Sequence, residues 1–346
     1  MFRALIAAAL WTGLAASPAL ADPCQMGRVG ALDVTWENNR ALAPVNINGH
    51  DVLALVDSGA TQSVLFRNAA DTLGLDYSIV NNRTAHGFGG AARIYSTNIG
   101  QLTLAGETAN SLRLDVIDST WRGGQPIAMI IGQNLLSSDN IEFDFAAGHL
   151  TFYRTHGDCA HTALAYWSED WSAVDMLPRD ISNHVMVHAQ LNGQTMRVLF
   201  DTGSPTSLVT LEAARRLGVS LQSNDVEAAH AVGGVGARRL QTWLGRFDSF
   251  VMGGESMSNA HLRIVDTHVP GNSHIGFDMI LGADFFRTHR VMFAYSQNKV
   301  YFVYLGGHVF QTIGPVELPG VAQADDPATA SEAPPPPETQ PPAAPH

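Results

Sequence analysis

Short apolar runs separated by glycine-containing turns recur along the chain, and they predict a protein built mainly of β-strands. An Asn-Gly pair at 48–49 lies between two apolar runs, which is the strongest short-range signal for a β-hairpin. The returning strand is expected at 52–56 and leads directly into Asp57. After a turn and another apolar strand piece, a short helix is expected at 67–73, and Gly74 ends it.

The same order of elements occurs a second time, 144 residues further along (201 − 57 = 144). A later pair of apolar-Gly motifs matches at an offset of 150 (282 − 132 = 150), so the second copy carries six extra residues (150 − 144 = 6). Two copies predict a duplicated lobe rather than a solenoid. The matching positions are Asn48-Gly49 with Asn192-Gly193, Asp57 with Asp201, Gly59 with Gly203, Ser63 with Ser207, Leu73-Gly74 with Leu217-Gly218, and Ile131-Gly132 with Leu281-Gly282.

Both ends of the chain differ in composition from the repeat. Residues 1–21 combine Arg3, an apolar stretch and Ala19-Leu20-Ala21, the order typical of a secretory signal peptide; a short buried helix is the less favoured alternative. Alanine, proline and glutamate dominate the other end, which predicts a disordered tail. The expected organisation is a signal peptide at 1–21, an N-terminal lobe at 22–158, an inter-lobe linker at 159–180, a C-terminal lobe at 181–318 and a disordered tail at 319–346.

Charge and cysteine content narrow the setting further. The net charge of −12 and a pI near 5.5 argue against binding to nucleic acid or to an anionic membrane. No segment after the signal is long and apolar enough for stable membrane insertion, so we expect a protein exported to the periplasm or secreted. Cys24 and Cys159 are the only cysteines, and a disulfide between them suits an oxidising compartment. A metal cluster around His156, Cys159 and His161 is less favoured, because zinc sites need three or four ligands.

Two aspartates occupy corresponding places in the copies, each at the end of an apolar strand and followed by a glycine turn. If the lobes pack about a pseudo-twofold axis, Asp57 and Asp201 meet at that axis. Two carboxyl groups a few ångströms apart share one proton because they cannot easily both ionise. The charged member then takes a proton from water, and the protonated member donates to an amide carbonyl. Asp57 and Asp201 are therefore the predicted catalytic residues, with no metal or cofactor required.

The residues that follow each aspartate fit this chemistry. Glycine allows the backbone to approach the carboxylates, and the hydroxyls of Ser58 and Thr202 are expected to bond across to the opposite loop. Because Ser204 stands where the first copy has alanine, we expect its hydroxyl to donate to Asp201 and make Asp201 the more acidic partner. The predicted supporting residues are Ser58, Gly59, Ala60, Thr202, Gly203 and Ser204.

A glycine-rich segment follows in each copy, at 87–90 and at 233–236. These segments are expected to form hairpin tips that fold over a substrate and exclude water. Phe88 is expected to pack on a bound peptide, and His86 is the histidine nearest a tip. The predicted substrate-binding residues are Gly87, Phe88, Gly89, Gly90, Gly233 and Gly234.

The sequences Asp57-Ser58-Gly59-Ala60-Thr61 and Asp201-Thr202-Gly203-Ser204 resemble the active-site motifs of aspartic proteases. The glycine-rich flaps and the Ile-Ile-Gly132 and Ile-Leu-Gly282 motifs resemble the retropepsin-like branch more than the pepsin branch, whose flap tyrosine is missing here. The resemblance spans about residues 42–305. It implies an all-β fold of two homologous acid-protease-like β-barrel lobes, related by a pseudo-twofold axis, with short helices. It also implies hydrolysis of peptide bonds in extended substrates.

Two functions of different class remain open on the sequence. The first is an aspartic endopeptidase acting on exported protein substrates, which the presence of both aspartates favours. The second is a non-catalytic peptide-binding protein that keeps the cleft without turnover, since a fold does not guarantee activity. In either case the expected partner is a peptide or protein, and the expected state is a monomer with both lobes in one chain.

Overall fold

The computed structural model describes residues 22–119, 125–236, 238–267 and 276–310. The predicted signal peptide, 1–21, and the predicted tail, 319–346, lie outside the described residues. Strands make up most of the described chain, and the four helices found there have four to six residues each. The predicted all-β fold with short helices is confirmed.

The first lobe is a closed barrel with an extra strand at each end of its sheet. The strand order is β2-β3-β4-β9-β5-β8-β7-β6, and an additional pairing of β3 with β7 closes a ring of six strands. The pairs β4–β9 and β5–β8 are parallel, whereas the remaining neighbours are antiparallel. The strands are β2 (Thr35–Glu37), β3 (Arg40–Ile47), β4 (His50–Val56), β5 (Val64–Phe66), β6 (Tyr77–Gly87), β7 (Gly90–Leu104), β8 (Glu107–Ile117) and β9 (Ile127–Ile131).

The second lobe repeats this topology. Its order is β13-β14-β19-β15-β18-β17-β16, with β13 also paired to β17, so another ring of six strands closes. The parallel pairs recur as β14–β19 and β15–β18. The strands are β13 (Met186–Leu191), β14 (Gln194–Phe200), β15 (Leu208–Thr210), β16 (Val226–Val232), β17 (Leu240–Met252), β18 (Glu255–Val265) and β19 (Met279–Leu281).

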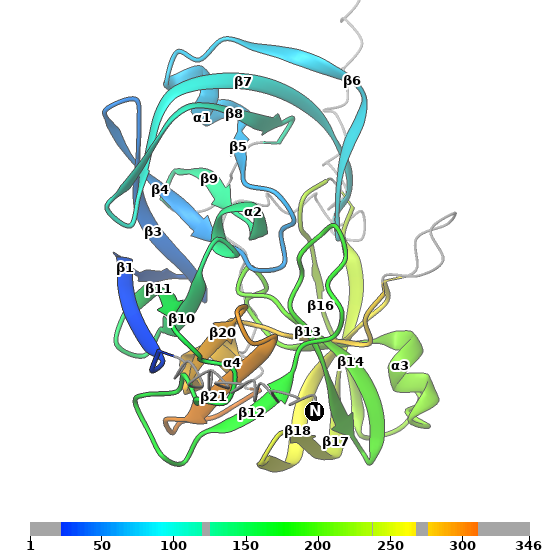
Figure 1. Cartoon of the computed structure of the whole chain (residues 1–346). Helices are drawn as coiled ribbons and strands as arrows, with labels where there is room; N and C mark the ends of the chain where they lie inside the picture. The colour runs from blue at the N-terminus through cyan, green and yellow to red at the C-terminus, as the bar shows by residue number, and fades with distance from the viewer. Residues whose placement is uncertain (1–21, 120–124, 237, 268–275, 311–346) are drawn as a thin grey trace, which may run out of the picture.

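A third sheet joins the halves, and Figure 1 shows it beside the two barrels. Its order is β1-β11-β10-β20-β21-β12, and β10 pairs antiparallel with β20, Ile141 opposite Phe293. The stretch 159–180, predicted as a linker, contributes β12 to this sheet. Its strands are β1 (Gln25–Asp33), β10 (Asn140–Asp144), β11 (His149–His156), β12 (Ser172–Asp175), β20 (His289–Ala294) and β21 (Lys299–Tyr304).

Local sequence signals account for the turns that shape each barrel. In the β3–β4 turn, Asn48 and Gly49 both have positive φ (51° and 86°), as a type I′ hairpin requires, and Asn192 and Gly193 do the same in the β13–β14 turn. The helices α1 (Arg67–Thr72) and α3 (Leu211–Arg216) are each followed by a glycine with positive φ, which ends the helix.

Apolar side chains from both barrels and the shared sheet form one continuous core. Fully buried phenylalanines lie at its centre, and Phe143 of β10 contacts Phe286 and Phe293 from the second half with ring centroids 5.1 and 4.8 Å apart. This core fixes the lobes against each other, and the strands that lead into Asp57 and Asp201 therefore end in a defined relative position. Cys24 and Cys159 form a disulfide that ties the start of β1 to the end of the first lobe.

Candidate active site

The two aspartates lie at the ends of corresponding strands. Asp57 follows β4 and Asp201 follows β14, and the backbone N–H of each donates to the carbonyl of the last residue of the neighbouring parallel strand, Ile131 or Leu281 (3.0 and 2.9 Å). Because parallel strands β4–β9 and β14–β19 end at the same edge of the barrel, each aspartate is directed out of its lobe toward the other. The carboxyl groups of Asp57 and Asp201 are hydrogen-bonded to each other.

Four hydrogen bonds cross between the two loops and lock them together. The Ser58 hydroxyl donates to the carbonyl of Phe200 (2.9 Å) and accepts from the N–H of Thr202 (3.0 Å). Reciprocally, the Thr202 hydroxyl donates to the carbonyl of Val56 (2.7 Å) and accepts from the N–H of Ser58 (3.0 Å). Both hydroxyls are fully buried, so these bonds have no competition from water.

The two glycines of these loops have no room for a side chain. A Cβ on Gly59 would lie 2.4 Å from Cγ of Asp201, and a Cβ on Gly203 would lie 2.3 Å from Cγ of Asp57. Each glycine N–H instead donates to its own aspartate, at 3.0 Å to Asp57 Oδ1 and 2.9 Å to Asp201 Oδ1. The structure therefore brings the predicted dyad and its glycine and hydroxyl partners into one two-fold arrangement.

A family model described as "Aspartyl protease" matches the chain twice, over residues 43–135 and 187–285, and covers more than half of its length. Each match contains one of the two paired aspartates. The chain belongs to the aspartyl protease family. A search of curated proteins found no significant match.

Among solved structures, this aspartyl protease is similar to the aspartic proteinase from Irpex lacteus. The sequence identity is 12%, the alignment covers 84% of this chain and 100% of the Irpex lacteus chain, and the TM-score is 0.47.

Electrostatics divides the roles of the dyad. Burial, together with the neighbouring charge of Asp201, raises the pKa of Asp57 well above its usual range. Burial also raises the pKa of Asp201, but hydrogen bonds from Asp57, from the N–H groups of Gly203 and Ser204, and the nearby His184 oppose that rise. The arrangement favours one shared proton held on Asp57, with Asp201 as the carboxylate.

The predicted role of the Ser204 hydroxyl is corrected by the structure. That hydroxyl donates to the carbonyl of Thr206 (2.9 Å), and the bond from Ser204 to Asp201 Oδ1 comes from its backbone N–H (3.2 Å). A turn of only two residues brings the Thr206 carbonyl into reach of the hydroxyl, which therefore stabilises its own loop. Ala60 occupies the matching place, and its carbonyl accepts from the N–H of Gln133 (2.8 Å).

Behind each loop, a buried serine and a side-chain carbonyl or carboxylate hold the strand that follows. Ser63 donates through its N–H and hydroxyl to Asn134 Oδ1 (2.6 and 2.8 Å), and Ser207 does the same to Asp284 Oδ1 (2.8 and 2.7 Å). Each serine hydroxyl also accepts the N–H of the glycine that precedes a short helix, α2 (Gln133–Leu136) or α4 (Ala283–Thr288). The apolar-Gly motifs thus support the two aspartate loops from behind.

The glycine-rich segments form two hairpin tips that meet each other. In Figure 1, β6 arcs over from the first lobe and reaches the β16 hairpin of the second. The carbonyl of Gly89 accepts from the N–H of Arg238 (2.7 Å), and a Cβ on Gly89 would lie 2.7 Å from the carbonyl oxygen of Gly234. Of the other predicted tip glycines, Gly87 would place a Cβ 3.0 Å from Cβ of Val235, Gly90 has a positive φ of 106°, and Gly233 directly follows β16.

Each tip places an apolar side chain against the opposite lobe. Phe88 packs on a second-lobe cluster, with its ring centroid 6.4 Å from that of Phe277. Val235 packs on the corresponding first-lobe cluster. The buried members of these clusters are Leu199, Leu208, Leu240, Val265 and Ile280 in the second lobe, and Leu42, Leu55, Phe66, Ile117, Ile127 and Ile130 in the first.

Two basic residues near the dyad were not predicted from the sequence. His184 Nε2 lies 3.3 Å from the Thr61 hydroxyl of the opposite loop, and burial lowers the pKa of this histidine. Arg40, at the start of β3, interacts electrostatically with Asp57. The repeat offset relates them (184 − 40 = 144), which is the signal that would have drawn attention to them. His86, the histidine noted in the sequence, lies exposed on β6.

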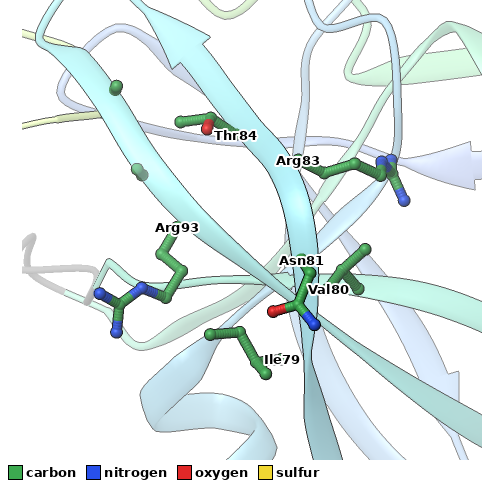
Figure 2. Close-up of a pocket in the computed structure, with 8 residues that line it drawn as sticks. Ile79, Val80, Asn81, Arg83, Thr84 and Arg93 are labelled. Atoms are coloured by element: carbon green, nitrogen blue, oxygen red, sulfur yellow. The ribbon is translucent and has the colours of Figure 1, made fainter.

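A cavity of about 370 Å³ lies on the first flap, where the β6–β7 pairing shifts register between Ile79 and Thr84 (Figure 2). Arg83 and Arg93 point in opposite directions there, and Arg83 is paired with Asp115 at 2.6 Å. The hollow therefore follows from the extra residues of the bulge and is separate from the dyad.

In the described part of the chain, no group of three or more His, Cys, Asp or Glu side chains is placed to hold a metal ion. Cys159, weighed above as a metal ligand, is in the disulfide. Of the helices described, none has the length and apolar character needed to cross a membrane.

Proposed function

We propose that the protein is an aspartic endopeptidase that hydrolyses peptide bonds of exported protein substrates. The observation that carries this proposal is the pair of hydrogen-bonded carboxyl groups, one from each lobe, with the cross-loop bonds of Ser58 and Thr202 holding them in place. Such a pair can act as base and acid at the same time without a covalent intermediate.

The reaction follows from the division of the proton. The Asp201 carboxylate takes a proton from a water molecule, the water oxygen bonds to the scissile carbonyl carbon, and Asp57 gives its proton to the carbonyl oxygen. A neutral gem-diol results. The C–N bond then breaks as Asp201 returns its proton to the leaving nitrogen and Asp57 recovers a proton from a gem-diol hydroxyl. Both carboxyl groups end in their starting states.

The apolar clusters support a preference for apolar substrate side chains beside the scissile bond. Leu55 and Leu199 lie two residues before their aspartates, so strand alternation places them on the same face as the dyad. Opening of the flaps would remove Phe88 and Val235 from these clusters and leave two apolar sites for an extended peptide. The expected signal sequence and the Cys24–Cys159 disulfide favour substrates outside the cytoplasm.

The test is cleavage of an extended-peptide library by the chain from Asp22 onward, across pH 3 to 8. We expect cleavage between apolar residues with a bell-shaped pH profile, and loss of turnover in Asp57→Asn and Asp201→Asn with peptide binding retained. Asp248→Asn, an exposed aspartate on β17, is the matched control and should cleave normally. Binding without cleavage in the unmodified chain, at every pH, would identify a peptide-binding protein instead.

A further inference from the structure

A buried amide, Gln133, lies behind the Asp57 loop and has no part in the reaction described above. It is the first residue of α2 and is fully buried. Its Nε2 donates to the carbonyl of Ser58 (2.8 Å), and its Oε1 accepts from the hydroxyl of Tyr295 (2.9 Å). Since a backbone carbonyl can only accept, the orientation of the amide is fixed by its partners.

These bonds form a relay that ends on a catalytic carboxyl group. The Ser58 carbonyl and the Gly59 N–H belong to one peptide unit, and that N–H donates to Asp57 Oδ1 (3.0 Å). From Tyr295 through Gln133 to Asp57, every donor points the same way. Hydrogen bonds aligned in this manner polarise one another, so the last donor is strengthened by those before it.

The symmetry-related position behind the Asp201 loop lacks both polar members of the relay. The offset of 150 residues places Ala283 at the position of Gln133 (283 − 133) and Phe145 at the position of Tyr295 (295 − 145). The register of β10 with β20 obeys the same relation, because Ile141 pairs with Phe293 and Phe143 with Val291. A methyl group and a phenyl ring thus replace the amide and the phenol together, and the relay serves one aspartate only.

We propose that Gln133 and Tyr295 are positioning residues that hold and polarise the Ser58–Gly59 peptide, so that its N–H stabilises Asp57 as that group gives its proton to the substrate. The inference rests on the proposed function. Asp57 becomes negatively charged only as the proton leaves, so the strengthened N–H favours the transition state over the ground state. The relay therefore acts on kcat rather than on KM.

The charged groups around the relay stay in place when its first member is changed. Asp57 faces Asp201, Arg40 and, through Asp201, His184; Arg40 in turn faces Glu37. The guanidinium of Arg179 lies 4.9 Å from the ring centroid of Tyr295. Burial raises the pKa of Tyr295, so its hydroxyl remains a proton donor over the working pH range. Removing that hydroxyl alone therefore isolates the relay from the other electrostatic contributions.

The deciding variant is Tyr295→Phe, with Tyr301→Phe as the matched control. Tyr301 belongs to the same shared sheet, and its hydroxyl also donates to a glutamine side chain, Gln297, at 2.8 Å, but this bond leads to no catalytic group. For Tyr295→Phe we expect kcat to fall about two- to fourfold with KM unchanged. Because Asp57 ionises second, the higher apparent pKa of the dyad should rise by about 0.3 to 0.6.

Gln133→Met, which keeps the side-chain length without the hydrogen bonds, should change kcat and the higher apparent pKa in the same direction and further. The pKa is measured in parallel by carbon-13 NMR titration of the aspartate carboxyl groups, which needs no turnover. If the unmodified chain cleaves nothing, the proposed function fails while this titration still tests the relay. An unchanged dyad titration in Tyr295→Phe, or an equal shift in Tyr301→Phe, would overturn the inference.

Discussion

Replacing Ser58 by alanine removes one hydroxyl that takes part in two of the four hydrogen bonds between the catalytic loops. The carbonyl of Phe200 and the N–H of Thr202 then lose their partners in a site that is fully buried. Each unsatisfied buried polar group costs about 1–3 kcal/mol, so the expected loss in the free energy of unfolding for the two groups is about 2–6 kcal/mol. Proteins are typically stable by about 5–15 kcal/mol, so this loss would be a large share of the total.

The same change should lower catalysis, because the loops that carry Asp57 and Asp201 are no longer held in one geometry. Urea unfolding gives the stability, and kcat on a cleaved peptide gives the catalytic effect. Ser258→Ala, at an exposed position on β18, is the control and should stay within about 0.5 kcal/mol of the unmodified chain. A stability loss below about 1 kcal/mol in Ser58→Ala, equal to that of the control, would refute the assignment of the cross-loop bonds as the lock.

Two further predictions concern the stability of the folded chain. Burial raises the pKa of Asp284 to about 6, above its value near 4 in an unfolded chain, so the native state binds this proton more tightly. The contribution of this group to stability is therefore greatest below about pH 4 and is lost as pH rises through about 6, by about 3 kcal/mol. Asp284→Asn, which copies Asn134 of the first lobe, should flatten the urea-unfolding profile between pH 4 and 6; parallel profiles would contradict the burial argument. Reduction of the Cys24–Cys159 disulfide, which spans 135 residues, should lower the unfolding free energy by about 2–5 kcal/mol. The double variant Cys24→Ser/Cys159→Ser should unfold at the urea midpoint of the reduced chain, whether or not reductant is present. If reductant left the midpoint of the unmodified chain unchanged, that result would argue against the bond.

Local signals in the sequence determined much of each lobe. Asn48-Gly49 and Asn192-Gly193 specify tight hairpins because both positions require positive φ, which few residues tolerate. Glycines after α1 and α3 end those helices for the same reason. The internal repeat identified Asp57 and Asp201 as equivalent, and two equivalent carboxylates at strand ends already indicate a dyad, since a twofold axis brings equivalent residues together.

Only the tertiary structure decided the contacts between residues far apart in the chain. The pairing of β10 with β20, the exchange of Phe88 and Val235 between lobes, and the approach of His184 to Thr61 each depend on how the halves pack. The Ser204 hydroxyl shows the limit at short range as well, because the sequence indicates a donor but not which of two nearby acceptors it faces.

The relay from Tyr295 to Asp57 illustrates the same division. In the sequence, Gln133 and Tyr295 are two polar residues 162 positions apart with no shared motif. Folding joins them because Tyr295, which follows β20 of the second half, packs behind the Asp57 loop of the first half. The repeat therefore fixed which residues are equivalent, whereas the packing of one half against the other determined which equivalent residues act differently.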